Sequence, residues 1–165
     1  MLPLSLLAAT KISNLLTSSN ALQEQISSLA SSAQSDIPVI NSTHVVLSSA
    51  SPDLADMNAQ LGYPRVCLYC NAIQNKQSEK FRSFSGTIAA VAEVWASANL
   101  VTQVDQWIHF YVEALTELLR AQRGDWGDGF FFSGKYDVQF QPPKSGGLGF
   151  VQSAKVTCTF NVSIT

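Results

Sequence analysis

Charged residues are scarce in this chain. Asp, Glu, Lys and Arg make up 13% of its 165 residues, about half of the usual share in a soluble domain. The ten Lys and Arg residues are scattered, and the formal net charge is −2. This balance argues against specific nucleic-acid binding, which needs a positive field to neutralise phosphates. Because 46% of the residues are hydrophobic, we expect part of the surface to face another protein chain.

Cysteine is also scarce, with Cys67, Cys70 and Cys158 as the only three. An odd, small number provides no disulfide framework and is typical of a reducing compartment. Cys67 and Cys70 have the spacing of a metal or redox motif, yet they lie in a predicted strand. Residues three apart in a strand point to opposite faces, so these two thiols cannot converge on one metal. We expect buried structural cysteines, with metal or redox use as the alternative, and no cofactor.

Signatures of catalysis are missing. His44 and His109 are isolated, and Ser85 in "FSG" lacks the glycine pattern of a nucleophile elbow. No two carboxylates stand at a spacing that commits them to acid–base chemistry. In "RGDWGDGFFF", Asp125 and Asp128 are expected to satisfy local backbone donors in a turn, with a divalent cation as the alternative. The sequence therefore predicts a protein that is not an enzyme.

Membrane-spanning runs and a secretion signal are not found either. The apolar N-terminus has no positively charged start and is interrupted by Lys11, so it does not resemble a signal peptide. No run has the length that crossing a bilayer requires. We therefore expect no membrane partner, and a protein that is cytoplasmic when it is made.

The length predicts one domain spanning residues 1–165. Leucine and isoleucine recur at helical spacing over residues 4–32, which predicts a long amphipathic N-terminal helix. Residues 32–64 are rich in Ser, Asp, Asn and Pro and form a connector with local structure. In it we predict a short strand at 44–48 and a helical turn at 52–59.

The second half predicts three strands and a helix. The strands are expected at residues 65–73, 130–140 and 150–164, and the last two alternate apolar and polar residues. A clear amphipathic helix covers residues 100–123 and ends at a glycine. The turn-rich stretch at 142–147 suits a hairpin between the last two strands.

Residues 85–97 are ambiguous, because an alanine-rich run can be a helix or a strand. As a helix they would fuse with the next one into a run far longer than the mean globular helix, so we favour a strand. Val91 and Trp95 would then share one face, which we predict to be a subunit interface. The alternative is that the chain's own N-terminal helix covers Trp95. Together these elements predict an α+β fold: an antiparallel or mixed four-stranded sheet with two main helices on one face.

The order of these elements resembles that of tail terminator proteins of long-tailed bacteriophages. The local sequence is also similar, in "FSGTIAAVAEVW", in "HFYVEALTELL" and in "GDWGDGFFFSGKYDVQF" followed by "GFVQSAKVTCTFNVS". The resemblance covers residues 64 to 165, and the N-terminal helix is compatible with it. These patterns contain no chemically diagnostic residue.

The resemblance implies a structural virion protein of the phage neck, assembled in the host cytoplasm. Terminators form six-fold rings that cap the tail tube, end its polymerisation and meet the head connector, and DNA can pass through the ring. The polar, charged loop at residues 74–86 and the hairpin tip at residues 142–147 would then contact the tail tube and the head connector, through Lys76, Glu79, Lys80, Arg82 and Lys144. Each of these loops can instead be merely solvated. The alternatives for function are a head-completion or tail-tube subunit, or a small binding module unrelated to phages.

Overall fold

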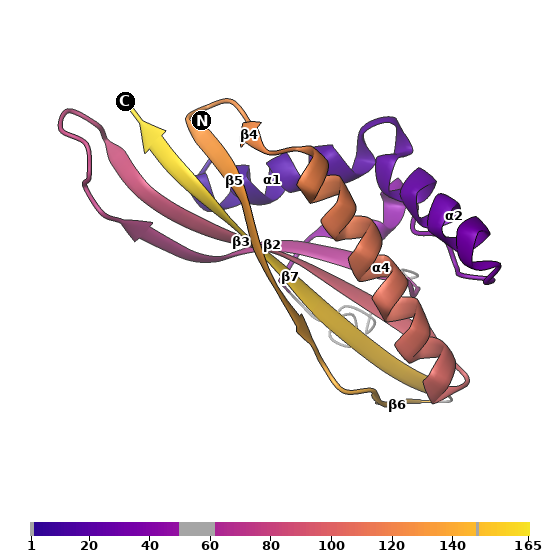
Figure 1. Cartoon of the computed structure of the whole chain (residues 1–165). Helices are drawn as coiled ribbons and strands as arrows, with labels where there is room; N and C mark the ends of the chain where they lie inside the picture. Colours follow the sequence, from indigo (N-terminus) through magenta and orange to yellow (C-terminus); the bar gives the residue numbers. More distant parts are fainter. Residues whose placement is uncertain (1, 50–61, 148) are drawn as a thin grey trace.

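The computed structural model describes residues 2–49, 62–147 and 149–165. It is an α+β fold in which helices cover one face of a long, twisted, mixed sheet (Figure 1). In the described part of the chain the sheet has seven strands: six follow the order β1-β2-β3-β7-β5-β4, and the seventh, β6, pairs with β7. The strands are β1 (Val45–Leu47), β2 (Arg65–Asn75), β3 (Phe84–Ala98), β4 (Gly124–Asp125), β5 (Phe130–Phe140), β6 (Lys144–Gly146) and β7 (Gly149–Ile164).

The centre of the sheet is the antiparallel pair β3–β7. It runs without interruption from Phe84 opposite Ile164 to Ala98 opposite Phe150. β2 flanks β3 and β5 flanks β7, both antiparallel, so the sheet joins two hairpins side by side. The strand predicted over residues 85–97 is confirmed, as are the other three predicted strands and the short one at 44–48.

The predicted number of four strands was wrong. The short strand predicted in the connector joins the sheet as β1, and β4 and β6 add two and three residues, too few for a hydrophobic period to be visible. β1 pairs parallel to β2, which makes the sheet mixed.

The prediction of a single N-terminal helix was also wrong. The segment forms two helices, α1 (Leu4–Thr17) and α2 (Ala21–Ala33), which are separated by the short 3₁₀ turn η1 (Ser18–Asn20). Ser19 and Asn20 adopt left-handed backbone angles, with φ of 51° and 57°. Asn is one of the few residues enriched in that conformation, so the break is compatible with the sequence. It lets α2 pack on α4 (Val101–Ala121), where Gln25 Nε2 donates to a Glu117 carboxylate oxygen.

The main core lies between the helices and one face of the sheet. Ile88 and Val94 of β3 and Val156 of β7 are fully buried there, against Ile12 of α1 and Ile108 of α4. The predicted alternation along β7 is confirmed, since Ala154, Val156, Cys158, Phe160 and Val162 all belong to this core. The alternating pattern along the strand therefore predicts which face of the sheet packs against the helices.

The connector contributes the 3₁₀ turn η2 (Ser42–His44) and β1, and it is anchored on α4 by Tyr111, whose hydroxyl donates to the Pro38 carbonyl oxygen at 2.6 Å. The helical turn predicted at 52–59 lies outside the described residues.

Candidate assembly surface

Five of the seven interface candidates occupy the two ends of the sheet. Lys76, Glu79, Lys80 and Arg82 lie at the tip of the β2–β3 hairpin, all exposed. Lys144 lies in β6, opposite Val151 of β7. The C-terminus lies at the same end as the hairpin tip, and β6 lies at the other (Figure 1). The tip contacts Ser163, which lies twelve positions along β7 from Val151, a distance of about 40 Å at the usual rise of a strand.

The hairpin tip is tied to the end of β7 by polar contacts. Glu79 Oε2 lies 3.3 Å from Arg82 Nε and accepts a hydrogen bond from Ser163 Oγ at 2.8 Å. Arg82 Nη1 donates to Thr165 Oγ1. Ser83 N donates to the Ile164 carbonyl oxygen at 2.9 Å. The tip is therefore positioned by the sheet, although its charged side chains face water.

Phe81 was missed by the sequence analysis. It stands at this tip between two cations and is 97% exposed, more than any other large hydrophobic residue in the described chain. Its backbone has a φ of 65°, which is rare for a bulky residue. The signal in the sequence was an aromatic residue between Lys80 and Arg82 in a polar loop.

Val91 and Trp95 lie together on the sheet face opposite the helices. They are only 2% and 7% exposed in the single chain. Trp95 packs in a small cluster with Cys67 and Val151, and Lys144 Nζ lies 5.4 Å from the centroid of its ring. The alternative in which the N-terminal helix covers Trp95 is therefore wrong, because α1 packs on the other face.

The same face carries a buried polar group. Glu93 is 8% exposed and accepts a hydrogen bond from Tyr69 Oη at 2.9 Å. Burial, together with this hydrogen bond, raises the pKa of Tyr69. Burial also raises the pKa of Cys67 to about 11, although the Arg65 charge partly offsets it. Phenol and thiol therefore keep their protons near neutral pH, and neither is a ready nucleophile.

Cys67 and Cys70 point to opposite faces, as the strand geometry predicted. Cys67 packs in the cluster around Trp95, whereas Cys70 packs against the main core. Within the described residues, no group of three or more His, Cys, Asp or Glu side chains is placed to hold a metal ion.

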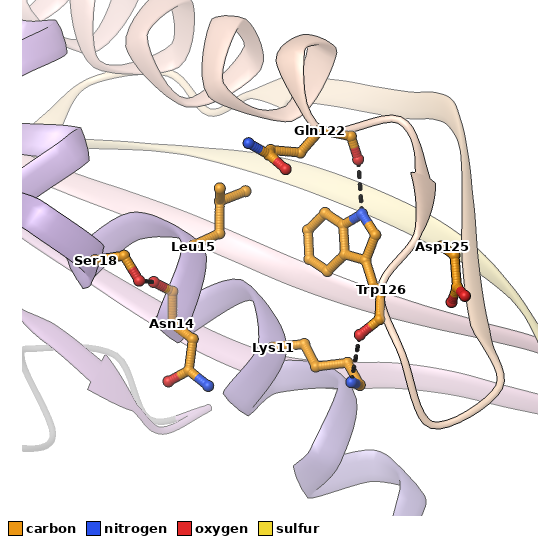
Figure 2. Close-up of a pocket in the computed structure, with 7 residues that line it drawn as sticks. All are labelled: Lys11, Asn14, Leu15, Ser18, Gln122, Asp125 and Trp126. Atoms are coloured by element: carbon orange, nitrogen blue, oxygen red, sulfur yellow. Dashed lines mark hydrogen bonds between the residues drawn. The ribbon is translucent and has the colours of Figure 1, made fainter.

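A hollow between α1 and the end of α4 contains polar groups that already have partners (Figure 2). Lys11 Nζ donates to the Trp126 carbonyl oxygen at 2.7 Å and to Asp128 Oδ2 at 2.8 Å. The indole Nε1 of Trp126 donates to the Gln122 carbonyl oxygen at 2.6 Å. Asp125 Oδ1 accepts from Gly127 N at 2.8 Å. These contacts fasten α1 to the turn before β5, which is a structural role.

A second hollow, of about 530 Å³, is mainly apolar. Leu2 lines it from just before α1, Leu4 and Leu7 from the first turn of α1, and Ile164 from the end of β7. Asp128 stands at its edge with a side chain that is 67% exposed. This hollow therefore lies at the same end of the sheet as the hairpin tip.

No family model and no curated protein matches the chain. Among the helices of the described residues, none combines the length and apolarity needed to span a bilayer.

Proposed function

We propose that this chain is a structural subunit of a phage tail, forming a six-fold ring that caps the tail tube and ends its polymerisation. One observation carries the proposal: a single long sheet presents two chemically different exposed ends about 40 Å apart. One end carries the charged tip with Phe81, and the other carries β6 with Lys144. A ring built from such subunits has two different axial faces.

These two faces match the two partners that a terminator must contact. The tail tube protein binds one face and the head connector binds the other. The remaining requirement is a head-to-tail contact between neighbouring copies that closes after six repeats. DNA passes through the ring without specific contacts, in keeping with ten scattered cations. The protein acts in the neck of the virion after assembly in the host cytoplasm.

The proposed function needs no chemistry and no cofactor. The polar side chains of the hollow in Figure 2 hold α1 in place, and the buried thiol of Cys67 stays protonated. What the subunit supplies is shape, apolar contact area and charge at its ends.

Electron microscopy of the purified chain, with and without tail tubes, tests this function. We expect six-fold rings, or caps on tube ends that stop further growth. Long tubes built from this chain would instead identify a tail-tube subunit. Monomers that ignore tube ends would contradict the proposal and favour an unrelated binding module.

A further inference from the structure

A third hollow, of about 400 Å³, lies beside Trp95 on the sheet face opposite the helices. β3 and β7 line it, with Trp95 directly opposite Ser153 in the pairing of these strands. Pro142, Pro143 and Lys144 line it from the segment that leads out of β5 into β6. This Trp95 hollow therefore lies at the β6 end of the sheet, away from the hairpin tip and the C-terminus (Figure 1).

Two hydrogen-bond donors on the wall of this hollow are buried without partners. Ser153 is only 4% exposed, and its hydroxyl makes no hydrogen bond to any of the described residues. Trp95 is 7% exposed, and its indole Nε1 is buried with no hydrogen-bond partner. Buried polar groups of native proteins are nearly always hydrogen-bonded, so each unpaired one needs an explanation. A bound group that accepts hydrogen bonds here supplies that explanation.

Lys155 brings a positive charge to the same hollow. It is half-buried and lies directly opposite Glu93, where cross-strand neighbours of opposite charge commonly pair. Glu93 instead accepts the hydrogen bond from Tyr69, which belongs to β2 on its other side. In the described part of the chain, no carboxylate lies within ion-pair distance of Lys155. Its ammonium is therefore available to an anion that enters the hollow.

The remaining groups favour an anion as well. An indole N–H and an ammonium donate hydrogen bonds and accept none. Lys144 Nζ, 5.4 Å from the centroid of the Trp95 ring, is a second cation, so two positive charges face the single charge of Glu93. The side chain of Gln152 is directed to α4, where its Nε2 donates to Asp105 Oδ1 at 3.1 Å. The hollow therefore suits a negatively charged group that accepts hydrogen bonds.

The apolar part of the wall decides which anion fits best. Trp95, Pro142, Pro143 and Val151 contribute hydrocarbon surface beside the donors. A free inorganic anion gains nothing from that surface, whereas an acidic side chain carries its carboxylate on methylene groups that can be buried against it. A glutamate on an extended segment of another protein satisfies both parts of the wall.

We propose that the Trp95 hollow binds a glutamate side chain of a partner protein, with Ser153 Oγ and Lys155 Nζ donating to its carboxylate oxygens. Its methylene groups pack against Trp95 and Pro143. The site is built from one chain and does not depend on a six-fold ring. Its use by the partner at the axial face that carries β6 rests on the proposed function.

NMR of the isotope-labelled full chain tests the site through its three tryptophan indole signals. The probe is an acetylated and amidated tetraglutamate peptide, and the uncharged tetraglutamine peptide is its control. We expect tetraglutamate to shift the indole signal of Trp95, which Trp95→Phe identifies, because the carboxylate enters beside that ring. The signals of Trp107 and of Trp126, whose indole already donates to the Gln122 carbonyl oxygen, should stay in place. Tetraglutamine should shift none of them.

Two variants test the assigned donors. Lys155→Gln should weaken tetraglutamate binding by about tenfold or more, as the loss of a hydrogen bond to a charged group usually does. Lys80→Gln removes the same charge at the exposed hairpin tip and should leave the affinity unchanged. Ser153→Ala should weaken binding and leave the urea midpoint of the chain unchanged, because its hydroxyl bonds to none of the described residues.

Each contrary result overturns a stated part of the proposal. An unmoved Trp95 signal at millimolar tetraglutamate, or equal affinities of the Lys155→Gln chain and the parent, would overturn the site. An equal response to inorganic phosphate at the same ionic strength would overturn the assignment to a glutamate of a partner protein. Rings that cap tail tubes without peptide binding would leave the proposed function standing, and peptide binding by a monomer would contradict the ring alone.

Discussion

Phe160 is the side chain whose removal tests the core most severely. It is fully buried on β7, and its ring centroid lies 5.0 Å from that of Trp126, 5.8 Å from that of Phe130 and 5.5 Å from that of Phe132. These rings link the centre of the sheet to the turn that Lys11 fastens to α1. Phe160→Ala would leave a cavity where three aromatic contacts meet.

The expected cost follows from this environment. Replacing a buried Phe by Ala usually lowers the free energy of unfolding by about 3–5 kcal/mol, cavity included. Part of this cost is the loss of aromatic pairs, each of which contributes about 0.5–1.5 kcal/mol beyond the contribution of its buried area. Since each 1 kcal/mol shifts Tm by about 2–4 °C in a chain of this size, Tm should fall by about 6–20 °C.

Urea unfolding followed by circular dichroism measures the loss. Phe140→Ala is the control, because Phe140 is 45% exposed and, among the described residues, its ring contacts that of His109 alone, with the centroids 4.6 Å apart. We expect the control to lose less than about 1 kcal/mol, as surface changes usually do. A loss below about 2 kcal/mol for Phe160→Ala, or equal losses in both variants, would show that this aromatic cluster does not hold the core together.

Three further predictions concern other parts of the fold. Val156→Asp puts a charge at a fully buried position and should prevent folding; a soluble variant melting within a few degrees of the parent contradicts the β7 register. Burial raises the pKa of Cys158 from 9.0 to about 12, so the unfolded chain loses that proton first. Stability should therefore fall as pH rises above about 9, and constant urea midpoints up to pH 10.5 would argue against this. Lys11→Met removes the bonds to Trp126 and Asp128 and should cost about 1–2 kcal/mol in urea unfolding. The exposed Lys135→Met is its control, and equal costs would contradict a role for Lys11 in fastening α1.

The sequence predicted the long strands because their alternation matches the sheet. Along β7, each buried residue from Ala154 to Val162 lies two positions from the next, so the pattern is visible without the structure. Alternation does not identify the strand at residues 85–97, because both of its faces are apolar. It was predicted instead because a helix there would fuse with the next one into an unusually long run. The pairing of β3 with β7 lies beyond such reasoning, because it joins segments more than fifty residues apart and no local signal selects the partner.

The remaining errors have local causes. The 4–32 helix breaks at Ser19 and Asn20, where the hydrophobic period continues across the turn and hides it. Of the candidate interface residues, the tip charges were expected to be exposed, and they are. Phe81 was overlooked because composition marks its loop as polar, and exposure of one aromatic ring depends on tertiary structure.

The mass of the assembled protein in solution shows whether the chain forms a six-fold ring. Sedimentation equilibrium or native mass spectrometry of the full chain, over a wide concentration range, gives that mass without any partner. The six-fold ring predicts a species six times the 17.9 kDa of one chain. A single 17.9 kDa species at every concentration, with no ring on tail-tube ends, would contradict it.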